Sequence, residues 1–336
     1  MSSIPLPLGA GEGLNVRATY FEYLLPHLVG RLRRMSRRTR ARKPQRVRRV
    51  QTRWFALGAG VLALAAAGWF FTRPDTLSAD GASVGPSLAS YKPPDVHALV
   101  VSPLDERTVT FGHHQGMLVS SDAGKSWRPI AGAGGKDAMG VTLPPNSTTA
   151  YAAGHDVFLR SDDGGTWSSV RPALPGTDIH AFTASATQPD TFYAFVVGYG
   201  LYKSPDAGAT WRQLGQIPGS TMSMAAARSG DTDVLFAATM ESGVMRSTDG
   251  GKAWEAVREL AGAGAVSAVG ETVYAGARNA VLVSQDSGRT WQRRNFTRNA
   301  ALVAPAPSNP STVYVLTDRL EVWRSVDGGA TWERAG

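Results

Sequence analysis

An eight-residue box that occurs six times constrains the fold of this chain more than any other feature. The box reads SSDAGKSW (120–127), RSDDGGTW (160–167), SPDAGATW (204–211), STDGGKAW (247–254), SQDSGRTW (284–291) and SVDGGATW (325–332). Successive box tryptophans are 40, 44, 43, 37 and 41 residues apart. A repeat near 40 residues is typical of propellers and solenoids, in which small structural units follow one another in an array.

Short runs of β-branched and aromatic residues precede each box. VHALVVS, TVTFG and GMLVS come before the first box, and ALVAP, TVYVL and EVWRS come before the sixth. Such runs, separated by Pro, Asp, Asn and Gly, indicate strands joined by turns. With the segment after each tryptophan as a fourth strand, each repeat predicts a four-stranded antiparallel sheet. Six such sheets around an axis predict an all-β, six-bladed β-propeller over residues 95–336.

The residue types of the box suit a tight turn between the third and fourth strands. The glycine supplies a positive φ angle, and the aspartate two positions earlier accepts hydrogen bonds from backbone amides of the turn. The tryptophan carries enough apolar area to fill the gap between neighbouring sheets. These structural roles are expected for Asp122, Asp162, Asp206, Asp249, Asp286 and Asp327.

With these boxes the chain resembles the BNR or Asp-box repeat proteins, which include sialidases, sortilin-type receptors and the photosystem II assembly factor propellers. The resemblance covers roughly residues 95–336. It implies the fold, whereas such folds host many unrelated activities. The segments VHALVVSP, FGHHQGM, KDAMGVTL, AAGHDVFLRSDDGG and DIHAFTAS also resemble an uncharacterised group of exported bacterial propellers, labelled sialidase-like or glycosyl hydrolase by analogy. Ala98 and Gln115 depart from the pattern of that group.

The positive net charge of +8 belongs to the N-terminal tail. Residues 1–53 carry 13 Lys or Arg and 2 acids, whereas residues 54–336 carry 22 Lys or Arg and 25 acids. The predicted propeller is therefore slightly acidic, which argues against nucleic acid as its partner. The chain has no cysteine, which excludes a lipidated cysteine, disulfides, thiolate metal sites and a cysteine nucleophile.

An uncharged apolar run, WFALGAGVLALAAAGWFF at residues 54–71, follows the basic tail directly. Its length just suffices to cross a bilayer as a helix, and aromatic residues stand at both of its ends. Basic residues stay in the cytoplasm, so we expect a cytoplasmic tail (1–53), a transmembrane signal anchor (54–71), a flexible linker (72–94) and an extracytoplasmic propeller. Two questions stay open. The run could instead be a cleaved signal peptide, with Ala65 and Ala67 before the cleavage site, and translation could begin at Met1 or at Met35.

The sequence offers little support for an enzyme. A sialidase needs arginines that converge on the substrate carboxylate, and a glycosidase needs two facing carboxylates. The first and second strands of the repeats are nearly devoid of Asp and Glu, and the Phe-Arg-Ile-Pro signature of sialidases is missing. No catalytic residue is therefore predicted.

Histidines in the first three repeats form the strongest candidate site. Two groups have fixed places relative to the box tryptophan, one near the start of the innermost strand (His97, Met139, His180 and Met222) and one in the turn between the second and third strands (His113, His114 and His155). Antiparallel strands bring both places to the same mouth of the central channel. Imidazole and thioether groups suit a soft or borderline metal such as copper, and a haem site or a histidine-rich binding mouth is an alternative. A purely structural interpretation also stands, in which the histidines are satisfied in turns and the methionines fill core gaps.

These observations together predict a membrane-anchored, extracytoplasmic propeller that acts as a binding or assembly module. Its expected partner is an exported or membrane protein, or a ligand or metal at the histidine-bearing face. The alternative function is a sialidase-like glycoside hydrolase.

Overall fold

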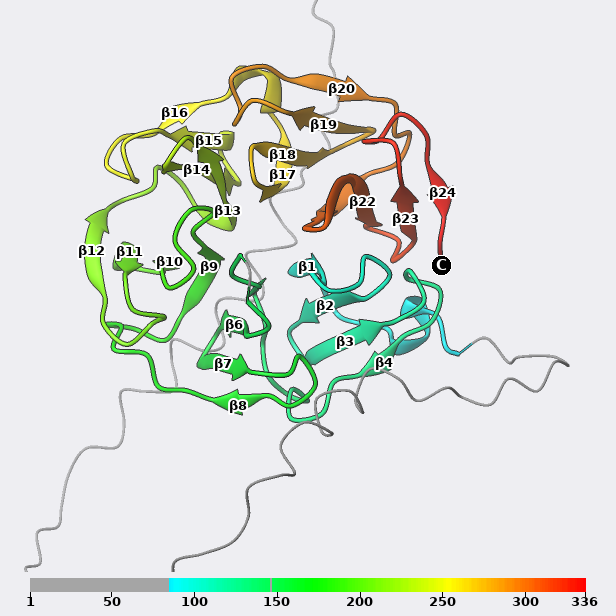
Figure 1. Cartoon of the computed structure of the whole chain (residues 1–336), viewed down its shortest axis with the longest axis horizontal. Helices are drawn as coiled ribbons and strands as arrows, with labels where there is room; N and C mark the ends of the chain where they lie inside the picture. The colour runs from blue at the N-terminus through cyan, green and yellow to red at the C-terminus, as the bar shows by residue number, and fades with distance from the viewer. Residues whose placement is uncertain (1–84, 146) are drawn as a thin grey trace, which may run out of the picture. The chain divides into compact units, whose positions relative to one another are not determined.

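The computed structural model describes residues 85–145 and 147–336, which fold into six four-stranded antiparallel sheets around a central axis (Figure 1). In each sheet, or blade, the strand nearest to the axis comes first in sequence, and the fourth strand lies on the outside. The predicted six-bladed propeller is thus confirmed. Two 3-10 helices, η1 (Leu88–Tyr91) and η2 (Arg258–Leu260), complete the regular structure of the described residues.

Each blade takes its four strands from one continuous stretch of chain. The first three blades consist of β1 (Ala98–Val101), β2 (Val109–His113), β3 (Gly116–Ser120), β4 (Arg128–Pro129); β5 (Gly140–Thr142), β6 (Ala150–Gly154), β7 (Val157–Ser161), β8 (Ser168–Ser169); and β9 (Ile179–Ala184), β10 (Phe192–Val196), β11 (Gly200–Ser204), β12 (Arg212–Gly215). The last three consist of β13 (Thr221–Ser229), β14 (Thr232–Thr239), β15 (Gly243–Ser247), β16 (Glu255–Ala256); β17 (Ala263–Val269), β18 (Thr272–Ala277), β19 (Ala280–Ser284), β20 (Gln292–Arg294); and β21 (Ala300–Ala306), β22 (Asn309–Thr317), β23 (Val322–Ser325), β24 (Glu333–Arg334).

The sixth box shows how the repeated turn is held. The hydroxyl of Ser325 donates to Asp327 Oδ1 at 2.7 Å and accepts from the Gly329 N–H at 2.8 Å. Asp327 also accepts from the hydroxyl and the backbone N–H of Thr331, at 2.6 and 2.9 Å. These bonds, led by that from the Thr331 hydroxyl, lower the pKa of Asp327 to about 2. Gly328 and Gly329 both have positive φ angles, of 71° and 85°. Ala123, Ala207 and Ser287 also adopt a positive φ at the place of Gly328, so the preference for glycine concerns the place of Gly329.

The second box differs from the prediction by one residue. Asp163, not Asp162, accepts from the Ser161 hydroxyl and from the backbone N–H groups of Gly165 and Thr166. Asp162 instead pairs with the Arg160 guanidinium at 2.7 Å. In this box the buried Ser161 lies six positions before the tryptophan, whereas the buried serine of the other boxes lies seven positions before it. Counting back from the tryptophan therefore gave Asp162 in place of Asp163.

The six box tryptophans lie between adjoining blades, as predicted. Each blade presents its tryptophan to the preceding blade, and each belongs to a different apolar cluster. The clusters place Trp127 between the sixth and first blades, Trp167 between the first and second, Trp211 between the second and third, Trp254 between the third and fourth, Trp291 between the fourth and fifth, and Trp332 between the fifth and sixth.

Removing a box serine should destabilise the fold measurably. Ser204 is fully buried and accepts from the Gly208 N–H at 2.8 Å, so Ser204→Ala leaves that buried N–H without its acceptor. We expect the free energy of unfolding to fall by about 1–3 kcal/mol, measured by urea denaturation. Ser169→Ala, at an exposed position of β8, is the matched control and should change little. Equal stability of the two variants would contradict the structural role of the box.

The ring closes by packing and hydrogen bonds between the first and last blades. In the described part of the chain, no blade takes a strand from the far end of the sequence. Instead, Glu106 Oε1 pairs with Arg324 at 3.0 Å, and the Tyr314 hydroxyl donates to the Glu106 carbonyl at 2.9 Å. Leu88 of η1 is buried in the apolar cluster at this seam. Part of the predicted linker 72–94 thus packs against the propeller, because Leu88 gains burial there.

The N-terminal predictions fall on residues outside those described. These are the basic tail 1–53, the apolar run 54–71 and the linker up to residue 84. Among residues 85–145 and 147–336, no helix has the length and apolar character needed to span a bilayer.

Candidate functional site

The central channel contains a cavity of about 140 Å³ that is lined by the first strands of the blades. His97, Met139 and Met222, three of the predicted site residues, lie in its wall. The described residues of the wall include no Asp, Glu, Lys or Arg. The described wall of the channel is therefore uncharged, and the charged groups gather at the mouth where His97 lies.

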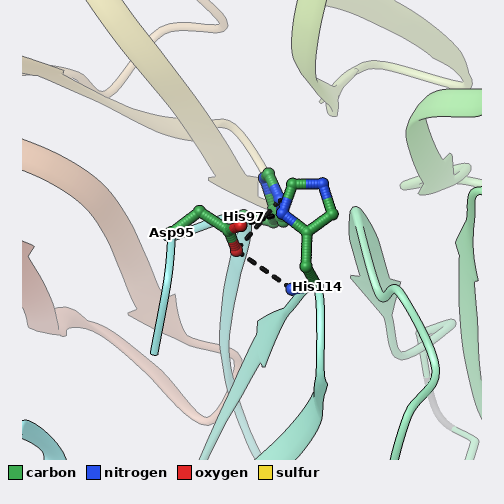
Figure 2. A group of neighbouring side chains, drawn as sticks. All are labelled: Asp95, His97 and His114. Atoms are coloured by element: carbon green, nitrogen blue, oxygen red, sulfur yellow. Dashed lines mark hydrogen bonds and ion pairs between the residues drawn. The ribbon is translucent and has the colours of Figure 1, made fainter. Parts of the chain in front are cut away.

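The first group at this mouth is a triad of Asp95, His97 and His114 (Figure 2). His97 Nε2 lies 3.1 Å from His114 Nδ1 and 3.2 Å from Asp95 Oδ1. His114 Nδ1 also contacts Asp95 Oδ2, and the His114 backbone N–H donates to Asp95 Oδ1 at 2.9 Å. Asp95 and His97 come just before β1, and His114 follows β2, so one blade supplies the whole triad. We call this group the first triad.

A similar group, which we call the second triad, consists of His155, Asp178 and His180. His155 Nε2 lies 2.9 Å from His180 Nε2 and 2.9 Å from Asp178 Oδ1, and His180 Nε2 lies 3.2 Å from Asp178 Oδ1. His155 belongs to the two-residue turn between β6 and β7, whereas Asp178 and His180 belong to the start of the third blade. The second triad therefore joins two blades.

Asp137 lies between the two triads. Its Oδ2 atom is 3.4 Å from His114 Nε2 and 2.6 Å from His155 Nδ1. Asp137 is buried, and among the described residues its Oδ1 atom has no hydrogen-bond partner. Seven side chains, four histidines and three aspartates, thus form one unbroken row along the mouth.

Glycines at the ends of two second strands allow this row to form. A Cβ atom at Gly154 would lie 1.9 Å from the Asp137 carbonyl oxygen, and one at Gly112 would lie 2.7 Å from the Ala138 carbonyl oxygen. Any other residue at Gly154 would push the backbone of residues 137–139 away. The missing side chain therefore lets Asp137 approach His155.

Three predicted site residues lie outside the row. His113 is buried, and its ring stacks on Phe111 with centroids 5.5 Å apart, while its Nδ1 atom accepts from the Gln115 N–H. The two methionines line the channel cavity. Of the seven side chains predicted at this mouth, the structure brings four together in the row, namely His97, His114, His155 and His180.

The aspartates of the row escaped the sequence-based prediction. Each precedes a predicted site residue by two positions, in Asp95-Val-His97, Asp137-Ala-Met139 and Asp178-Ile-His180. This repeated spacing, in three consecutive blades, was the signal that could have revealed them. They were missed because the acids were sought within the strands, whereas these three lie just before them.

Burial and the row of carboxylates shift the pKa values of the histidines in opposite directions. Burial lowers the pKa of His97 to about 4, so His97 is neutral at pH 7 and has a free nitrogen lone pair. Hydrogen bonds to Asp137 and Asp178 raise the pKa of His155 to about 10. Hydrogen bonds from His155 and His180 lower the pKa of Asp178. The middle of the row thus stabilises a positive charge.

The geometry of the second triad fits one bound cation. Two imidazole nitrogens and a carboxylate oxygen lie 2.9–3.2 Å from one another. Hydrogen bonds alone cannot satisfy all three edges of this triangle, because each Nε2 atom carries at most one hydrogen and the carboxylate carries none. Ligands bound to one ion at about 2.1 Å lie about 3.0–3.4 Å apart. A divalent cation would bind all three lone pairs at once.

Comparisons with known proteins give limited information. No family model matches the chain. The vacuolar protein sorting/targeting protein 10 of Emericella nidulans is 41% identical over 63 residues, which is 18% of this chain and 4% of that protein. An ancestral GH74 enzyme has a TM-score of 0.50 at 16% identity, over 75% of this chain and 42% of its own. YCF48 bound to a D1 peptide has a TM-score of 0.46 at 18% identity, over 71% and 81% of the two chains. Likeness at this level concerns the fold alone.

Proposed function

We propose that this chain is a binding module whose recognition face holds divalent metal at the mouth of the propeller. The observation that carries the proposal is the second triad, in which two imidazole nitrogens and a carboxylate oxygen converge at the spacing of ligands around one ion. Two histidines and one carboxylate on one side of an ion leave coordination positions open on the other. The side chains of His155, Asp178 and His180 are all partly exposed, so a donor group of a partner can reach these positions.

The donor atoms narrow the choice of metal. Imidazole nitrogen and carboxylate oxygen suit borderline divalent ions such as Zn²⁺, Fe²⁺, Ni²⁺ and Cu²⁺. The sequence predicted copper because histidines and methionines were expected to bind together. The methionines lie in the channel wall instead, and Cu²⁺ stays among the candidates because it also binds imidazole. A metal with open positions would bind carboxylate or other oxygen donors of an exported or membrane protein, or of a small ligand. The glycoside hydrolase alternative receives no support from the channel, since its described wall lacks Asp, Glu and Arg.

We further propose that the chain is anchored in a membrane, with residues 1–53 in the cytoplasm and the propeller outside. The support is the sequence: an uncharged run at 54–71 after a tail with 12 basic residues in positions 31–53. The propeller part of the chain also resembles BNR or Asp-box proteins in its six boxes. Alkaline extraction of bacterial membranes that contain the chain tests the anchor. Retention in the membrane supports it, whereas release of a shortened chain that begins near residue 68 would indicate a cleaved signal peptide.

Metal titration of the full chain tests the binding function. The protein, purified in mild detergent with its tag removed and treated with a chelator, is titrated with Zn²⁺ against a chromophoric competitor. We expect uptake of Zn²⁺ by the wild type. His155→Ala should weaken binding at the second triad more than about 100-fold, because changes outside the ligand shell already cost about 10- to 100-fold.

Asp156→Asn is the matched control for this titration. Asp156 is an exposed carboxylate next to His155, it belongs to neither triad, and it accepts a hydrogen bond from Thr177 that asparagine can also accept. The affinity of the Asp156→Asn variant for Zn²⁺ should equal that of the wild type. A wild type that takes up neither Zn²⁺ nor Co²⁺, Ni²⁺, Cu²⁺ or anaerobic Fe²⁺ would contradict the proposed function.

A further inference from the structure

The two inner histidines of the row each face two carboxylates with different ring nitrogens. His114 turns Nδ1 toward Asp95 in the first triad and Nε2 toward Asp137. His155 turns Nδ1 toward Asp137 and Nε2 toward Asp178 in the second triad. Three candidate ion positions therefore follow one another along the row, namely the first triad, a central group (His114, Asp137 and His155) and the second triad.

The chemistry of imidazole limits how many of these positions can be filled together. A neutral ring carries one lone-pair nitrogen and one N–H, so His114 and His155 can each be a ligand in only one position. Three ions would require both rings to lose their second proton as well. An ion in the central group would take one nitrogen from each ring and leave N–H groups facing Asp95 and Asp178.

Filling the two outer triads makes ligands of all four histidines and of two of the three aspartates, Asp95 and Asp178. Each ion then has two imidazole nitrogens and a carboxylate, and His97 and His180 are both ligands. The second N–H groups of the two inner histidines, on His114 Nε2 and His155 Nδ1, then both face Asp137 Oδ2, at 3.4 and 2.6 Å. Histidine ligands commonly donate their second N–H to such an outer carboxylate, which fixes the ring and its tautomer.

We infer that the mouth holds two divalent cations, one in each triad, and that Asp137 is their shared outer carboxylate rather than a ligand. This inference rests on the proposed function and deepens it. Asp137 orients His114 and His155 at the same time, so the two ion positions share one positioning residue. The burial of Asp137 and its unpartnered Oδ1 atom, within the described residues, also favour positive charge on both sides of it.

The number of bound ions in single variants tests this arrangement. The full-length, tag-free protein is titrated with Co²⁺, which reports ligand geometry by its visible spectrum, and bound metal is counted by elemental analysis. We expect two ions in the wild type and in Asp156→Asn. Asp95→Asn and Asp178→Asn should each retain one. Asp137→Asn should retain two ions, with both affinities about 10- to 100-fold weaker.

Other outcomes overturn the two-ion arrangement and leave the proposed function standing. One ion that disappears in Asp137→Asn but persists in Asp95→Asn and Asp178→Asn would place the metal in the central group. A wild type with a single ion, lost in only one of Asp95→Asn and Asp178→Asn, would mean that only one triad binds metal. Three ions in the wild type would require His114 and His155 to bind metal through both ring nitrogens. If circular dichroism shows that Asp137→Asn does not fold, the numbers of ions bound by Asp95→Asn and Asp178→Asn still distinguish two ion positions from one. Absence of metal from the wild type would contradict both proposals.

Discussion

The Gly154→Ala variant is expected to lose most of its metal affinity although none of its ligands is changed. The added Cβ atom would lie 1.9 Å from the Asp137 carbonyl oxygen and 2.9 Å from the Met139 backbone nitrogen. Both contacts are with backbone, so the segment 137–139 must move, and with it the carboxylate that orients His155. We expect affinity for Zn²⁺ to fall about 100-fold, the upper range for a disturbed outer shell. Crowding should also lower the free energy of unfolding by about 1–3 kcal/mol.

Gly264→Ala is the matched control for this variant. Gly264 is exposed on β17, and a Cβ atom there would meet no other atom within 4 Å. Neither glycine has a positive φ angle, so the two substitutions differ only in the space around them. Competition titration with Zn²⁺ and urea denaturation provide the two measurements. Wild-type affinity in Gly154→Ala would show that the approach of Asp137 to His155 does not control the site.

The sequence predicted the fold almost completely because each repeat places the same residue types at the same contacts between blades. Trp127 and Trp211, for example, occupy equivalent gaps between blades because each follows the same turn in the same register. A periodic signal of this kind survives local irregularities. The exception is Asp163, where a box shortened by one residue moves the turn carboxylate away from the position that counting predicts.

The candidate site was predictable only in part, since it depends on side-chain directions and close contacts that strand order does not specify. Topology alone places His97 and His180 near the turn histidines. It does not reveal that His113 turns inward onto Phe111 while His114 faces Asp95. These two are adjacent in sequence, and their opposite directions follow from the alternation of side chains at the end of a strand. The role of Asp137 depends on the space left by Gly154, a packing detail that no sequence pattern indicates.

The Trp127→Ala variant is expected to be the most destabilised of the single substitutions considered. Trp127 is 2% exposed and packs edge-on against Phe111, with ring centroids 6.4 Å apart. Its indole N–H donates to the Gly124 carbonyl at 3.0 Å, and its own carbonyl accepts from the Tyr91 hydroxyl at 2.7 Å. A buried tryptophan replaced by alanine costs about 3–5 kcal/mol, through lost burial and the cavity left behind.

The position of Trp127 at the seam of the ring adds a second reason for a large effect. Its cluster includes Leu302, Leu316 and Val322 of the last blade, and within the described residues no strand pairing joins the first blade to the last. Trp211→Ala is the matched comparison, because Trp211 is partly exposed between two blades that follow each other in sequence. Urea denaturation should give a larger loss of stability for Trp127→Ala than for Trp211→Ala. Equal losses would mean that the seam is no weaker than the other blade contacts and that packing at the tryptophan does not close the ring.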